Sequence, residues 1–353
     1  MVAAAGWERI LELIILGMVI SLAVLIVFMI AQKLRIEHVR RREERVARDL
    51  ARVLADGATA QVPALNPAAA PDRRALARAL AVHGDAAAVT ALREAYPHLV
   101  EQLQREARHG RWGRRAAAIE GLGLLHMESL REFFLDRLAL DPDARVRATV
   151  LEALSRLVRR REDLEQLASV MPGVPGLAAG FHEAVLVRAL QSLDAAGAPS
   201  TDIFAGFIEK LPATDPLLRV ALAAAGRTGQ PRFVPLLATR TLDPALPLAS
   251  HLSGLRALGR LQPDHPILLS VLKSGSAESR LVAARVIRDA SPATLAALRD
   301  ALADPNFHVR RNAARTLFDL GEAGNAALRA TGAGQDAYAA DMSRYVLATE
   351  TPR

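Results

Sequence analysis

A pattern that recurs about every 30 residues runs through most of this 353-residue chain and limits the folds it can adopt. In each unit a polar residue precedes small residues, and an apolar residue follows seven positions later, as in RAAAIEGL and RATVLEAL. Seven units begin at Arg115, Arg147, Glu183, Arg219, His251, Arg280 and Arg310, and RALARAL near Arg73 begins a degenerate eighth. The spacing predicts an array of similar structural units.

Within each unit a helical segment, a short polar or Gly/Pro break and a second helical segment follow one another. A helix pair of this length cannot bury its apolar face alone, so neighbouring pairs must stack. The chain is rich in Ala, Leu and Val and has only 4% aromatic residues, which suits closely packed helices. We therefore predict an all-α fold, a right-handed α-solenoid of about seven to eight helical pairs over residues 73–332. A capping helix and tail are expected in 333–353.

Two units open with the same motif, D-P-x-x-x-V-R, once from Asp141 to Arg147 and once from Asp304 to Arg310. This motif resembles that of short bacterial HEAT repeats, also called phycobilisome-lyase-type repeats, and the resemblance covers roughly residues 73–332. Asp suits the cap of a new helix, and Pro is tolerated in its first turn. The resemblance also implies that Asp and Arg pair between successive repeats, so Asp141, Arg147, Asp304 and Arg310 are expected to be structural.

The resemblance further implies that the second helix of each pair lines a concave face where partners bind. Two such helices are expected to begin at Met127 and Ser200. Exposed Phe and Arg side chains on them are the first candidates for partner contacts.

A run of 19 residues without charge, from Leu13 to Ala31, is long enough for a helix to cross a bilayer. Seven Lys and Arg residues follow this run within 33–48, whereas only Arg9 precedes it, so the carboxyl-terminal part is expected in the cytoplasm. We predict a short extracytoplasmic N-terminus (1–12), a transmembrane helix (13–31) and an inner (plasma) membrane location. A cleaved signal peptide is the alternative, although no Ala-x-Ala site follows before Lys33.

The charged residues of 32–56 continue with helical spacing, which predicts a juxtamembrane helix. Its apolar residues occupy one heptad register, which permits a weak dimer through residues 36–53; the register comprises Ile36, Val39, Val46, Leu50 and Val53, with Glu43 at an equivalent position. The alternative is an amphipathic helix that rests on the solenoid or on lipid headgroups. Residues 57–72, with three prolines and little charge, are expected to form a linker.

No sequence motif for catalysis or metal binding is present. The chain has no cysteine, which excludes disulfides and thiolate sites, and its nine histidines are scattered. Metalloprotease, P-loop, nucleophile-elbow and EF-hand motifs are absent. We therefore predict a protein that is not an enzyme and has no cofactor or metal.

Arginines cluster at two places, and the chain carries a formal net charge of +7. If both clusters share one edge of the solenoid, they form a docking strip for lipid headgroups, an acidic protein or a polyanion. A solvated arginine-rich surface is the alternative. The clusters are Arg105, Arg108, Arg111, Arg114 and Arg115, and Arg156, Arg159, Arg160 and Arg161.

These features together favour a membrane-tethered scaffold or accessory subunit with a membrane-associated protein partner, for example in a glycosyltransferase complex. One alternative is polyanion or nucleic-acid binding through the basic edge, which the membrane segment and the modest charge disfavour. The other is an enzyme similar to the HEAT-like lyases, for which no chromophore-binding surface is recognisable.

Overall fold

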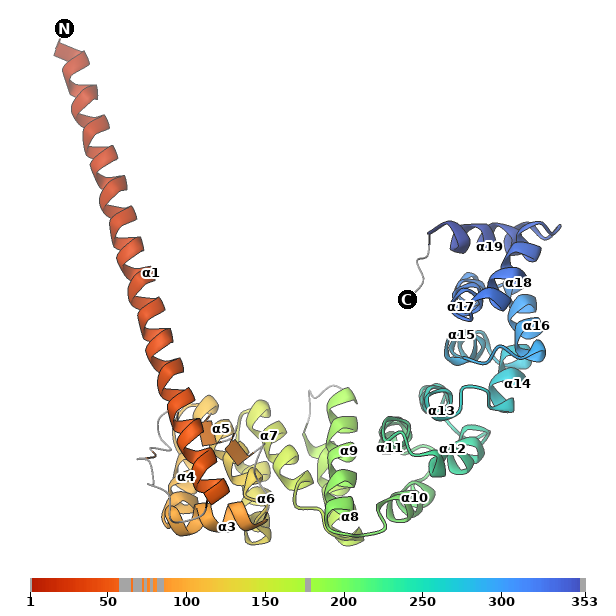
Figure 1. Ribbon diagram of the computed structural model, residues 1–353, viewed down its shortest axis with the longest axis horizontal. Helices are drawn as coiled ribbons and strands as arrows, with labels where there is room; N and C mark the ends of the chain where they lie inside the picture. The colour runs from red at the N-terminus through yellow and green to blue at the C-terminus, as the bar shows by residue number, and fades with distance from the viewer. Residues whose placement is uncertain are drawn as a thin grey trace. The chain divides into compact units, whose positions relative to one another are not determined.

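The computed structural model describes residues 2–56, 65, 72, 75–76, 79–80, 86–174 and 179–349. In these residues every regular element is an α-helix or a short 3-10 helix, and none is a strand (Figure 1). The prediction of an all-α fold is confirmed, and the arrangement is consistent with an α-solenoid. Contacts divide the chain into two compact units, Met1–Ala153 and Leu154–Arg353.

The first unit begins with one long helix, α1 (Val2–Asp56), whose carboxyl-terminal part packs against α3. Glu43, Val46 and Leu50 are buried there, so the end of the predicted dimer face is covered by the same chain. This burial agrees with the alternative of an amphipathic helix that rests on the solenoid, and the weak dimer through residues 36–53 stays a prediction. The other helices whose bounds the structure describes are α3 (Ala86–Ala95), α4 (Leu99–Arg108), α5 (Trp112–Leu124), α6 (Arg131–Leu140) and the start of α7 (Ala144–Ser155), with a 3-10 turn at Glu128–Leu130.

The predicted linker 57–72 lies outside the described residues apart from Leu65 and Asp72. Asp72 is fully buried, and Arg42 of α1 donates to both of its carboxylate oxygens at 2.9 and 3.1 Å. The end of this segment is therefore packed against α1.

The amino-terminal half of α1 carries apolar side chains that are exposed without exception between Met18 and Ile30 wherever they are described. Nevertheless, no helical segment within the described side chains of the chain is both long and apolar enough to cross a membrane. The predicted span 13–31 therefore has no support there; side chains 13–16 and 19 lie outside the described ones.

The second unit alternates first and second helices of successive pairs. The first helices after α7 are α9 (Ala179–Ala195), α11 (Pro216–Arg227), α13 (Leu248–Leu261), α15 (Ala277–Val286) and α17 (Phe307–Asp319). The second helices are α8 (Arg161–Val170), α10 (Ser200–Lys210), α12 (Val234–Thr241), α14 (Pro266–Ser274), α16 (Pro292–Asp300) and α18 (Glu322–Gly332). Short 3-10 turns occur at Met171–Gly173, Pro231–Phe233 and Ala301–Ala303, and α19 (Ala337–Thr349) follows.

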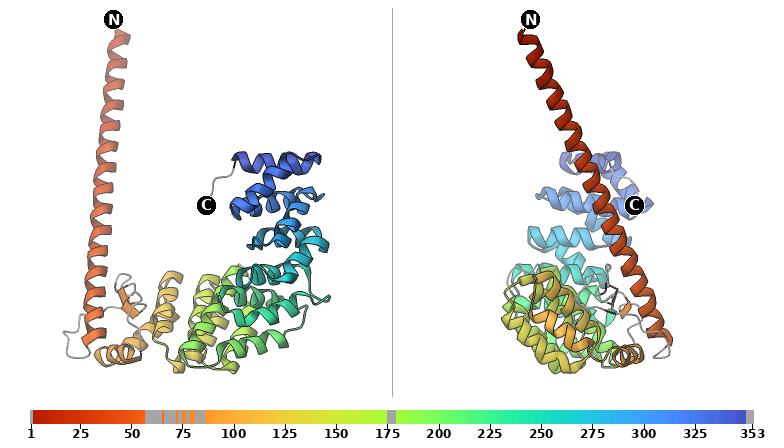
Figure 2. Two further views of the ribbon diagram at one scale, coloured as in Figure 1. Left: turned by 45° about the vertical axis from the view of Figure 1, so that its right-hand side comes forward. Right: turned by 90° about the vertical axis from the view of Figure 1, so that its left-hand side faces the viewer.

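First helices pack on first helices along this unit, from α9 through α17, and α19 packs on α17 and α18 (Figures 1 and 2). Five of the seven repeat starts recognised in the sequence lie in these first helices, and Arg115 and Arg147 lie in α5 and α7. The repeat period therefore corresponds to one helical pair.

The first helices, not the second, lie on the inner side of the curve that residues 154–349 follow (Figure 1). The prediction that second helices line the concave face is wrong for this unit. Small residues explain the difference: a Cβ on Gly226 would come within 2.5 Å of the Ala257 Cα, so first helices approach closely. On the outer side, the aromatic ring of Phe204 packs between those of Phe207 and Phe233 and occupies more space.

The phenylalanines expected to contact partners are core residues. Phe134 and Phe204 are fully buried, and Phe133 and Phe207 are 8% and 5% exposed. Stacking of the helical pairs buries the faces that carry these rings. The phenylalanines therefore stabilise the fold and are not available to a partner.

Asp141 and Asp304 are predicted to cap helices, but the capping residue lies two positions later in both repeats. Asp143 caps α7 by accepting from the Arg145 amide, and Asn306 caps α17 in the same way. Asp141 and Asp304 instead accept the amides of these capping residues, at 3.0 and 2.8 Å. Asp215 does cap α11, where Pro216 is the first helical residue.

Candidate anion-binding groove

Four arginines line a groove between α13 and α15 in the second unit. Arg256 and Arg260 come from α13, Arg285 from α15 and Arg288 from the segment after it. The groove has a volume of about 420 Å³, and its apolar lining comes from Leu281, Val282 and Val286. It therefore combines several cations with an apolar floor.

The repeat itself places these arginines together. Arg256 and Arg285 each lie five positions after the start of their sequence repeat, so they occupy the same face of neighbouring helices. Gly259 brings the helices close, because a Cβ there would lie 2.5 Å from the Val286 Cβ. Two equivalent guanidinium groups thereby face one groove.

The positive charge of the groove is largely uncompensated within the second unit. Among the described residues, no carboxylate lies within ion-pair distance of Arg256 or Arg285. Burial lowers the pKa of Arg256 below its ordinary value, and the like charges of Arg285 and Arg260 lower it further. An anion in the groove would relieve this repulsion.

One acidic residue reaches the edge of the groove. Glu183 of α9 lies 2.6 Å from Arg227 and 3.7 Å from Arg260, and it is only 8% exposed. It partly neutralises Arg260 and leaves Arg256 and Arg285 as the main cations.

Arg288 donates to the backbone carbonyls of Arg285 and Ile287, both at 2.7 Å.

The first predicted arginine cluster belongs to the first unit and is only partly available. Arg115 is engaged with Asp141 at 2.7 and 2.9 Å, and Arg108 lies 5.3 Å from the ring centroid of Phe133. Arg105, Arg111 and Arg114 are exposed. These three retain the surface position expected of them.

The second predicted cluster, in the second unit, is compensated by nearby acceptors. Arg156 is buried, Arg159 donates to the Ser192 carbonyl, and Arg160 lies 3.6 Å from Asp163. Arg161 pairs with Glu165 at 3.1 Å. The two clusters fall in different units, so a single strip formed by both stays a prediction.

The motif arginines and aspartates form contacts between repeats. Arg115 and Arg280, each from the preceding repeat, donate hydrogen bonds to the carboxylates of Asp141 and Asp304. Arg147 and Arg310 donate to the backbone carbonyls of the same two aspartates, both at 2.7 Å. The pairing implied by the resemblance therefore involves the arginine of the preceding repeat, because the motif arginine is occupied at the turn.

Two of the described histidines have local structural roles. His265 caps α14 by accepting from the Ile267 amide, and the Nδ1 of His251 lies 2.8 Å from the Thr241 carbonyl. Within the described residues, no group of His, Asp and Glu is arranged to hold a metal ion.

The groove arginines were not singled out in the sequence, where Arg105–Arg115 and Arg156–Arg161 are denser along the chain. The missing signal was the repeat register: arginine recurs at the fifth position after the unit start in Arg188, Arg256, Arg285 and Arg315. Residues 29 or more apart in the chain become neighbours only when the repeats stack.

Comparison with known proteins agrees with this architecture. Residues 266–339 match the family of HEAT repeats. The match and the all-helical fold support a HEAT-repeat protein. No curated protein matches the chain. HEAT repeats are generally non-enzymatic and mediate protein–protein contacts, which suggests an interaction scaffold.

Proposed function

We propose that this protein is a membrane-tethered scaffold that binds a protein partner on the inner side of its repeats. The observation that carries the proposal is the arginine groove, in which Arg256 and Arg285 have no carboxylate partner among the described residues. Interfaces are often dominated by a few anchoring groups, and arginine is prominent among them.

The tether is α1. Its apolar side chains from Met18 to Ile30 are exposed where they are described, and monomeric soluble proteins rarely expose an apolar surface of this extent. Insertion of residues 13–31 in a bilayer would cover them. The lysine and arginines that follow would keep the repeats on the cytoplasmic side of the inner membrane, with the N-terminus outside.

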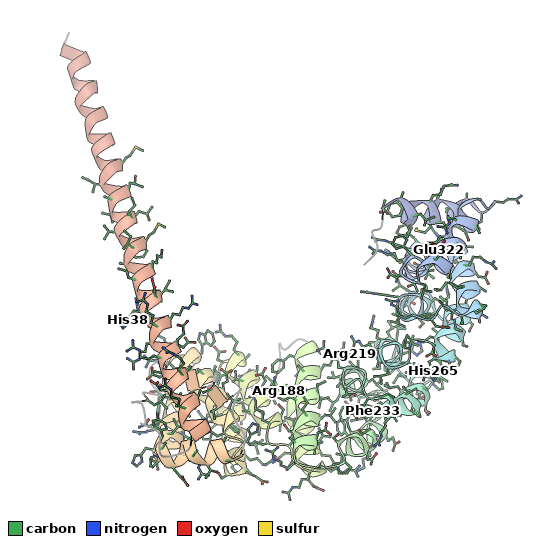
Figure 3. The ribbon with its side chains drawn as sticks, in the orientation of Figure 1. His38, Arg188, Arg219, Phe233, His265 and Glu322 are labelled. Atoms are coloured by element: carbon green, nitrogen blue, oxygen red, sulfur yellow. The ribbon has the colours of Figure 1, made fainter. Side chains whose placement is uncertain are left out.

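A tethered scaffold reaches only partners at or near the same membrane, so the partner is membrane-associated. Arg219 of α11 suits a test of this surface because it is exposed and lies on the inner side of the curve (Figure 3). It is not part of the groove, so its replacement leaves the four groove arginines intact.

The test is site-specific photocrosslinking in membranes of the native host, with the crosslinking residue at Arg219. Lys273 of α14 and Arg299 of α16, which are exposed on second helices, serve as matched controls. We expect one partner, identified by mass spectrometry, to crosslink at Arg219 and not at the controls. Equal labelling at all three positions, or none at Arg219, would contradict the proposal.

A further inference from the structure

We infer that the groove between α13 and α15 binds an extended acidic segment of the protein partner, with carboxylates three residues apart. The inference rests on the proposed function and specifies the chemistry of the partner. Its site is defined by Arg256, Arg260, Arg285 and Arg288.

Charge and geometry favour carboxylates as ligands. The guanidinium group of arginine is a planar fork that binds a carboxylate through two parallel hydrogen bonds. Arg256 and Arg285 have no carboxylate partner among the described residues, so both forks are available. Two carboxylates would satisfy them and remove the repulsion between them.

The helix spacing sets the spacing of these carboxylates. Packed helices lie about 8–10 Å apart, and Arg256 and Arg285 occupy equivalent positions on neighbouring helices. A polyproline II segment advances about 9 Å per three-residue turn and presents residues i and i+3 on one face. A Glu-x-x-Glu segment in this conformation therefore matches the two arginines.

The lining of the groove favours a peptide over nucleic acid. Leu281, Val282 and Val286 can pack against methylene groups and peptide backbone. None of the described residues that line the groove is aromatic, so they provide no stacking platform for bases. Four arginines also provide fewer contacts than the 6–10 or so phosphates that a duplex-binding protein typically neutralises.

The test measures binding of a fluorescent peptide with Glu at positions i, i+3 and i+6 to the full chain in detergent, by anisotropy. The same peptide with Gln at these positions, one with its Glu residues adjacent, and a DNA duplex are the comparison ligands. Arg256→Glu/Arg285→Glu should lower the affinity for the Glu-x-x-Glu peptide by about tenfold or more, since two charged hydrogen-bonded pairs are lost.

Arg105→Glu/Arg111→Glu is the matched control, because it changes the net charge equally at exposed arginines of the first unit. We expect it to leave peptide affinity within about twofold, because neither residue lines the groove. If the groove variant is not folded by circular dichroism, Arg256→Gln/Arg285→Gln replaces it with the same expected direction.

Equal weakening by both double variants would overturn the inference, because net charge alone would then explain binding. Equal affinity for the peptides with spaced and adjacent Glu residues would contradict the extended conformation with carboxylates three residues apart. If the duplex binds more tightly than the peptide and this binding depends on the groove arginines, the assignment of an acidic peptide as the ligand is wrong. A partner that still crosslinks at Arg219 while peptide binding fails would leave the scaffold proposal intact. Loss of crosslinking alone would instead count against the scaffold.

Discussion

Arg280 of α15 binds the carboxylate of Asp304 through two hydrogen bonds, Nε to Oδ2 at 2.7 Å and Nη2 to Oδ1 at 3.1 Å. The side chain of Asp304 is 8% exposed, and that of Arg280 is 20% exposed. Asp304 belongs to the turn that opens the next repeat, so the pair links neighbouring repeats. Arg115 and Asp141 form the same contact in the first unit.

Replacement of this arginine should destabilise the repeat array. We expect Arg280→Gln to lower the free energy of unfolding by about 2 kcal/mol, because it leaves a buried carboxylate with one partner fewer. Urea denaturation at pH 7 measures the change. Arg299→Gln is the control, since Arg299 and Asp300 form an exposed pair at 3.6 Å that should contribute less than about 0.5 kcal/mol. Equal losses in the two variants would show that the inter-repeat pair has no special contribution.

The contribution of this pair should depend on pH. Burial raises the pKa of Asp304, but hydrogen bonds from Arg280 and the Asn306 amide outweigh it, so the pKa lies below its ordinary value. A lowered pKa stabilises the fold above the unfolded pKa, and this stabilisation is lost as pH falls through the folded pKa. The advantage of the native chain over Arg280→Gln should persist from pH 7 to about pH 5 and shrink below about pH 4. Denaturation curves in that range measure it, and an advantage that stays constant to low pH would contradict the assignment.

Close packing of first helices should make one glycine intolerant of a methyl group. Gly226→Ala places a Cβ 2.5 Å from the Ala257 Cα, so α11 and α13 must separate, at a cost of about 1–3 kcal/mol. Gly113→Ala in α5 is the matched control: nothing lies within 4 Å of its new Cβ, and helix propensity predicts a gain of about 0.5–1 kcal/mol. Thermal melts followed by circular dichroism should shift in opposite directions. A Tm that rises in both variants would be evidence against close packing at Gly226.

The tether can be tested through its exposed apolar residues. Val24→Asp/Phe28→Asp should weaken membrane insertion of α1, because each carboxylate costs about 2.5–3.5 kcal/mol near the middle of a membrane helix. We expect the native chain to remain with membranes after alkaline extraction and the variant to be released. Val24→Leu/Phe28→Leu should behave like the native chain. Extraction of all three chains to the same extent would refute membrane insertion.

Helical pairs and their approximate starts could be predicted from the sequence, because small and apolar residues recur with a period that only stacked helices can bury. The turns were predicted less well. Asp141 and Asp304 resemble helix caps in a linear pattern, but the chain starts each helix two residues later, at Asp143 and Asn306. Arginine side chains from the preceding repeat occupy the carboxylates instead, and that contact spans 24 to 26 residues.

By itself the sequence determined that this protein is all-helical and repetitive, since the period and the caps act over neighbouring residues. Only the tertiary structure decided which helices face inward and which cations meet. Curvature depends on how closely side chains of adjacent repeats pack, and Gly226 and Gly259 allow the first helices to approach. Arg256 and Arg285 share a groove for the same reason: electrostatic contact depends on distance in space, and stacking brings together residues that are 29 positions apart.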